Sequence, residues 1–209
     1  MRLADCSGLL DLVFVLDSSG SIDRVRFNVI KETVVETIAE LDVGLERTRV
    51  GLVYWSNDAH VAFHMNDYGQ VKQDVVEAVR RVPFVGNTTY TAAALRLVHA
   101  AAFQPHNGDR DGVANVAVLV GDGNSNVRPE LTPVEAAVCR VSGIRMVVAV
   151  VYDDQMDISE LSTIASRPLS ENLFTGAPDE LFHNITELLI GSTCNFTGLL
   201  CAGCFWCCE

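Results

Sequence analysis

The chain has 209 residues, of which 49% are hydrophobic, and its 27 acidic and 15 basic side chains give a formal net charge of -12. This length suits one domain with a sizeable core and is short for two. The negative charge argues against nucleic acid and anionic lipid as partners, and no segment approaches the run of about 20 apolar residues that a membrane span needs.

The first half of the chain predicts buried strands joined by a helix and a hairpin. Asp11–Leu16 is an unbroken apolar stretch typical of a strand covered on both faces. Apolar residues at helical spacing predict a helix over Asp23–Leu41. Arg49–Trp55 is expected to be a second strand, and His60–His64 a shorter one that pairs with it through the turn at Ser56–Asp58.

The second half predicts further helices and strands in alternation. Helices are expected over Gln70–Arg81, Thr91–Ala101, Pro133–Ser142, Asp157–Ser166 and Asp179–Leu189, and strands over Val113–Val120, Ile144–Val151 and Asn172–Phe174. Such alternation predicts an α/β fold: a doubly wound, mainly parallel sheet with one antiparallel edge strand and helices on both faces. Ligands of these sheets bind outside the carboxyl ends of the strands.

Two aspartates lie at such strand ends. Asp17 follows the first strand and Asp122 the fourth, and a carboxylate buried there is costly unless something pairs with it. Ser19 and Ser21 follow Asp17 at alternate positions, and Gly86–Thr91 brings threonines to the start of a helix. An all-oxygen cluster of this kind suits Mg²⁺ or Mn²⁺. From the residues alone, a second interpretation stays open, in which both serines cap the helix and both aspartates are turn residues.

The segment Asp11–Ile22 resembles the opening strand and Asp-x-Ser-x-Ser motif of the von Willebrand factor A-type family. Gly86–Leu95 is similar to the family's glycine-led Thr-x-Thr segment, and Val118–Gly123 to its Asp-Gly element. The three elements occur in the family's order, and the resemblance covers about Asp11–Ile190. It implies the Rossmann-like fold of this family and a binding module of the matrilin, collagen and integrin inserted-domain kind.

The resemblance implies a metal-ion-dependent adhesion site that holds Mg²⁺ or Mn²⁺. Its ligands in this chain would be Asp17, Ser19, Ser21, Thr89 and Asp122. Thr91 would cap its helix, and Thr88 is the alternative to Thr89 if the loop aligns one residue away. Two positions depart from the family's pattern without removing a ligand: Gly121 replaces the common threonine and Ala92 the usual glycine.

The resemblance also implies a disulfide between Cys6 and Cys194 that closes almost the whole chain. Cys139 lies in a predicted helix and is expected to stay a buried thiol. The cysteines of the tail could hold zinc or form disulfides to a further segment, and disulfides are favoured for an extracellular protein. The expected division is a lead-in over 1–10, the A-type domain over 11–193 and a cysteine-rich, truncated tail over 194–209.

Cysteines and sequons favour a secreted, extracellular-matrix protein, although the first residues show no signal peptide. Asn184 and Asn195 are the glycosylation candidates, whereas Asn87 lies beside Thr89 and is expected to carry little or no glycan.

The favoured function is an adhesion or matrix-binding module without enzyme activity, because no phosphate loop, nucleophile elbow or zinc-protease motif is present. Its partner would be an extracellular protein, such as collagen or another matrix protein, that offers an acidic side chain to the ion. The alternative is a structural interaction domain whose metal site is non-functional.

Overall fold

A computed structural model describes residues 9–122, 125–151 and 158–195. A six-stranded sheet forms its centre, with the strand order β3-β2-β1-β4-β5-β6. The strands are β1 (Leu10–Asp17), β2 (Thr48–Trp55), β3 (Ala59–Phe63), β4 (Ala114–Gly121), β5 (Ile144–Val151) and β6 (Leu173–Gly176). Only the pairing of β2 with the edge strand β3 is antiparallel among these strands. The predicted fold class is therefore confirmed.

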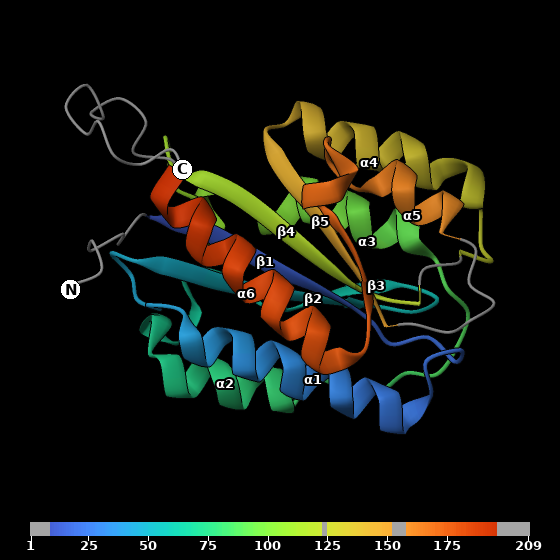
Figure 1. The fold of residues 1–209 in the computed structure, drawn as a ribbon, viewed down its shortest axis with the longest axis horizontal. Helices are drawn as coiled ribbons and strands as arrows, with labels where there is room; N and C mark the ends of the chain where they lie inside the picture. The colour runs from blue at the N-terminus through green and yellow to red at the C-terminus, as the bar shows by residue number, and fades with distance from the viewer. Residues whose placement is uncertain (1–8, 123–124, 152–157, 196–209) are drawn as a thin grey trace.

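Helices cover both faces of the sheet (Figure 1). One face carries α1 (Asp23–Glu40), α2 (Lys72–Arg80) and α6 (Pro178–Asn195), and the other carries α3 (Thr91–Leu97), α4 (Thr132–Val141) and α5 (Ser159–Ile164). The helix predicted over Thr91–Ala101 changes to a π-helical turn at Val98–Ala102, and α6 continues past its predicted end at Leu189. Within the described residues, no helix combines the length and apolar character that crossing a membrane requires.

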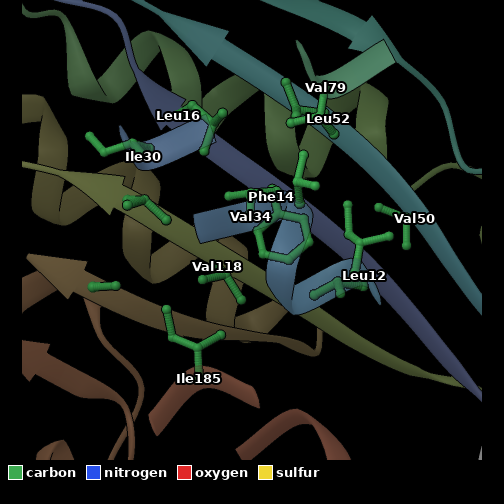
Figure 2. Close-up of a cluster of buried hydrophobic side chains, with 14 of the residues drawn as sticks. Leu12, Phe14, Leu16, Ile30, Val34, Val50, Leu52, Val79, Val118 and Ile185 are labelled. Carbon is green, nitrogen blue, oxygen red and sulfur yellow. The ribbon is translucent and has the colours of Figure 1, made fainter. Parts of the chain in front are cut away.

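The strand β1 is buried along its whole length. Leu12, Phe14 and Leu16 face α1, α2 and α6, and Figure 2 shows Phe14 among side chains of the sheet and of these helices. Val13 and Val15 face the opposite helix layer. A strand covered on both sides needs apolar residues at successive positions, which explains its unbroken hydrophobic run. Each large apolar side chain buried here contributes about 1.5–3 kcal/mol.

The sheet register brings the two strand-end aspartates together. β1 and β4 are parallel neighbours, and Leu16 lies opposite Val120. Asp17, the last residue of β1, and Asp122, the residue after β4, therefore lie at the same end of the sheet, as the sequence predicts. From β1 the chain adds β2 and β3 on one side, and then β4, β5 and β6 on the other side. Open α/β sheets bind ligands at such a switch point, which here lies between β1 and β4.

The opposite end of the sheet is fastened by a buried ion pair. Asp11, in β1, is fully buried, and its carboxylate accepts hydrogen bonds from Arg110 Nη2 at 2.6 Å and Nε at 2.9 Å. The Arg110 backbone N–H donates to the same carboxylate at 2.7 Å. Burial raises the pKa of Asp11 although these contacts with Arg110 oppose the change. The carboxylate thus depends on Arg110 to remain charged inside the fold.

Cys139 is a buried free thiol on α4, as predicted, and burial raises its pKa to about 12. Its Sγ donates to the Leu95 carbonyl at 3.3 Å. Cys6 and the cysteines after Asn195 lie outside the described residues, and the side chain of Cys194, at the end of α6, is not described either. The disulfide between Cys6 and Cys194 therefore stays a prediction.

We expect Arg110→Ala to lower the free energy of unfolding by about 3–5 kcal/mol, because it leaves a buried carboxylate without its partner. Arg26→Ala is the matched control, since Arg26 pairs with Asp23 at 3.9 Å on the exposed face of α1, where an ion pair contributes about 0–1 kcal/mol. Urea denaturation at neutral pH measures both. Equal stability of the two variants would contradict the role given to Arg110.

Candidate metal centre

Asp17 ends β1 with its carboxylate inside the protein, where its residue is 0% exposed. Oδ1 accepts a hydrogen bond of 2.8 Å from the backbone N–H of Ser19. Oδ2 is buried and has no hydrogen-bond partner within the described part of the chain. A buried, unpartnered carboxylate oxygen is costly, so this atom has an unmet requirement for a donor or a cation.

The second carboxylate makes the requirement stronger. Burial raises the pKa of Asp17 to about 7, and the negative charge of Asp122 is the second cause. Hydrogen bonds from Ser19 oppose the change. Asp122 follows β4 and is only partly buried. Two carboxylates this close favour either a proton or a cation between them.

The hydroxyls of Ser19 and Ser21 lie on the same loop, and their Oγ atoms are 3.1 Å apart. Neither hydroxyl caps α1. Asp23 does so instead, because its Oδ1 accepts from the N–H groups of Val25 at 2.7 Å and Arg26 at 2.9 Å. The interpretation of the serines as helix caps is therefore wrong, and both hydroxyls are left for another role.

Thr89 and its neighbours approach from the loop before α3. Thr89 is 2% exposed, whereas Thr88 lies on the surface and its carbonyl accepts from Ser56 Oγ at 2.8 Å. The expectation that Thr91 caps α3 is wrong. The position before this helix is Tyr90 and makes no side-chain capping bond, and Thr91 Oγ1 is buried without a partner among the described residues.

Ser18 fastens the Asp17 loop to the loop that carries Thr89, a role the sequence analysis missed. Its hydroxyl donates to the Pro83 carbonyl at 3.1 Å and accepts from the Val85 N–H at 2.7 Å. Its carbonyl accepts from the Gly86 N–H at 2.8 Å. The motif pattern marks Ser18 only as a variable position, so no local signal identifies it.

Ser56, at the end of β2, fastens the Thr89 loop from another side and was also missed. It is 1% exposed, and its hydroxyl accepts from the Asn87 N–H at 3.1 Å in addition to its bond to Thr88. The Ser56 carbonyl accepts from the Tyr90 N–H at 2.8 Å. One buried serine thus holds the backbone of Asn87, Thr88 and Tyr90, which lie on both sides of Thr89.

Two glycines allow the loops to approach closely. A Cβ at Gly121 would lie 2.7 Å from Asp17 Cβ, so glycine here leaves room for the Asp17 side chain. A Cβ at Gly20 would lie 3.0 Å from the Gly86 carbonyl oxygen. Gly121, which departs from the expected threonine, therefore suits the observed packing of Asp17. Ala92, the other departure, is fully buried in α3.

The donors at this end of the sheet suit a hard divalent cation. They are two carboxylates with neutral hydroxyls, and the described ranges contain no cluster of three or more His, Cys, Asp or Glu that could hold a metal by itself. Oxygen ligands of this kind favour Mg²⁺ or Mn²⁺ over softer metals. The unpartnered Asp17 Oδ2 fits such an ion.

Comparisons with known proteins agree with this fold. A family model described as the von Willebrand factor type A domain matches residues 11–188. Matrilin-3 of Mus musculus is 35% identical over 169 residues, which are 79% of this chain and 34% of matrilin-3. The collagen alpha-4(VI) chain of Mus musculus is 30% identical over 187 residues, which are 88% of this chain and 8% of the collagen chain.

A solved structure is similar over nearly the whole chain. Proximal thread matrix protein 1 from the mussel byssus, with a zinc-occupied MIDAS motif, has a TM-score of 0.75 and 26% identity, covering 92% of this chain and 47% of that one. This chain thus spans less than half the length of each of the three proteins. Because the family model matches most of its residues, the chain belongs to the von Willebrand factor type A domain family.

Proposed function

We propose that this domain is an extracellular adhesion or matrix-binding module that binds protein ligands through a divalent ion at the candidate metal centre. The observation that carries the proposal is the buried Oδ2 of Asp17, which has no hydrogen-bond partner among the described residues and lies beside the carboxylate of Asp122. The proposed ligands are Asp17, Ser19, Ser21, Thr89 and Asp122, with Mg²⁺ or Mn²⁺ as the ion. The zinc-occupied MIDAS motif of the byssus thread matrix protein supports a divalent metal at this place in the fold.

The charges of the site explain how it would recognise a partner. Asp17 and Asp122 neutralise a divalent ion, while the serine and threonine hydroxyls add no charge, so the loaded site is not anionic. The bound ion would offer an electron-poor position to a carboxylate from the partner. Such a charge-assisted contact at the centre of an interface contributes strongly to specificity. We therefore propose a partner that presents Asp or Glu.

Similarity to matrilin-3 and to a collagen chain supports the proposal that this domain is part of a matrix protein and binds another matrix protein. We propose secretion, with glycans at Asn184 and Asn195, since both lie on α6 and not among the loops of the metal face. Asn184 is partly buried, and the side chain of Asn195 is not described. Asn87 is exposed on the metal face, where a glycan would obstruct a ligand.

The function is tested by binding to immobilised matrix proteins in Mg²⁺ and in EDTA. We expect wild type to bind in Mg²⁺ only and Asp17→Ala to lose this binding while keeping its circular dichroism spectrum, because Asp17 is the last residue of β1 and its buried carboxylate is costly without a cation. Asp111→Ala removes the same charge from an exposed position before β4, at the opposite end of the sheet, and should bind like wild type. Equal Mg²⁺ uptake by wild type and Asp17→Ala in calorimetry would overturn the proposal.

The raised pKa of Asp17 also predicts how stability depends on pH without metal. Folding raises the pKa of Asp17 from an ordinary value of 3.8 to about 7. The folded protein therefore binds the Asp17 proton more tightly than the unfolded chain does. The resulting stabilisation is complete below about pH 4 and is lost as pH rises through about 7. Each pKa unit is worth about 1.4 kcal/mol, which gives at most about 4 kcal/mol for this group.

In EDTA, we therefore expect the free energy of unfolding of wild type to fall between pH 5 and 8 more steeply than that of Asp17→Asn. The asparagine variant should be the more stable of the two at pH 8, because it places no charge beside Asp122. Urea denaturation across this pH range measures the difference. Parallel pH profiles for the two proteins would show that Asp17 is not the responsible group.

A further inference from the structure

The main chain of Thr89 is held by the segment Ser125–Val127, which follows the Asp122 loop. The Thr89 N–H donates to Asn126 Oδ1 at 2.9 Å. In return, the N–H groups of Asn126 and Val127 donate to the Thr89 carbonyl at 3.0 and 3.1 Å. These contacts engage only the backbone of Thr89, so they fix its position without using its hydroxyl.

The same segment is fastened to the scaffold by α5. The Ser125 N–H donates to Glu160 Oε2 at 2.9 Å, and Ser125 Oγ donates to the Thr89 carbonyl at 3.1 Å. A path of hydrogen bonds therefore runs from α5 to Thr89, which is one of the three proposed neutral ligands of the ion. Metal ligands are held in geometry by outer contacts of this kind.

We propose that Asn126 is a positioning residue for the metal ion: its carboxamide oxygen holds Thr89 in place so that the threonine hydroxyl stays directed to the ion. This inference rests on the proposed function. Asn126 ties together the two loops that follow β4 and precede α3, which carry Asp122 and Thr89. It thereby sets the spacing between a charged and a neutral ligand that lie 33 positions apart in the sequence.

The proposal distinguishes the Asn126 side chain from its main chain. Truncation at Cβ removes the acceptor of the Thr89 N–H but keeps the backbone N–H that donates to the Thr89 carbonyl. Asn126 is exposed, so truncation leaves no cavity in the core. We therefore expect the loop to persist with Thr89 less well held, and the effect to fall on metal affinity and not on folding.

The test compares Mn²⁺ binding by wild type, Asn126→Ala and Asn126→Asp. Loss of an outer contact weakens metal binding by about 10–100-fold, so we expect the dissociation constant of Asn126→Ala to rise by about 10-fold or more in calorimetry. Asn126→Asp keeps an oxygen acceptor for the Thr89 N–H and should bind Mn²⁺ at least as tightly as wild type. The electron paramagnetic resonance spectrum of bound Mn²⁺ should change in the alanine variant only.

Asn57→Ala is the matched control, since Asn57 Oδ1 accepts from Asn87 Nδ2 at 3.2 Å on the same face but does not contact Thr89. It should bind Mn²⁺ like wild type, and all four proteins should melt at similar temperatures in EDTA. Unchanged affinity in Asn126→Ala, no recovery in Asn126→Asp, or an equal loss in Asn57→Ala would overturn the positioning role. Failure of wild type itself to bind Mn²⁺ would instead overturn the proposed function.

Discussion

The site depends on two carboxylates that the fold places side by side at the end of its central strands. β1 and β4 are parallel neighbours, so Asp17 and Asp122 both lie at the carboxyl-terminal end of the central strands. Asp17 is fully buried there, one of its oxygens has no partner in the described part of the chain, and its pKa is raised to about 7. Without a cation this arrangement lowers the stability of the fold at neutral pH. A bound cation would remove this destabilisation, which favours metal binding. Conformational stability and ligand binding are therefore linked through Asp17.

Buried polar side chains connect the Asp17 loop and the end of β2 to the loop that carries Thr89. Ser18 joins the Asp17 loop to residues 83–86, and Ser56 joins the end of β2 to residues 87–90. The close approach of Gly20 to Gly86 leaves no room for larger side chains. The far end of the sheet is held separately by the ion pair of Asp11 with Arg110. Residues on loops can thus be placed accurately by the packed scaffold that holds those loops.

The sequence predicts the sheet, its edge strand and the shared location of Asp17 and Asp122, because these follow from hydrophobic periodicity and from the direction of parallel strands. It does not predict Ser18, Ser56 or Asn126, since each acts through residues 31 or more positions away in the chain. Two capping interpretations are wrong: the open alternative that Ser19 and Ser21 cap α1, and the cap of α3 by Thr91 that the family resemblance implies. Asp23 caps α1 from a left-handed backbone position with φ of 57°, and Thr91 is buried without making the expected cap. The sequence marks Gly121 only as a departure from the family's common threonine, because its close approach to Asp17 depends on packing between strands.

The central claim is that the oxygen atoms of Asp17, Ser19, Ser21, Thr89 and Asp122 surround one divalent ion. Anomalous X-ray diffraction from crystals of the domain grown with Mn²⁺ tests this most directly, because the metal is located by its own signal. The account predicts one strong anomalous peak at the carboxyl ends of β1 and β4, within coordination distance of the Asp17 loop. The absence of a peak there in crystals that hold Mn²⁺ at another acidic position would contradict it.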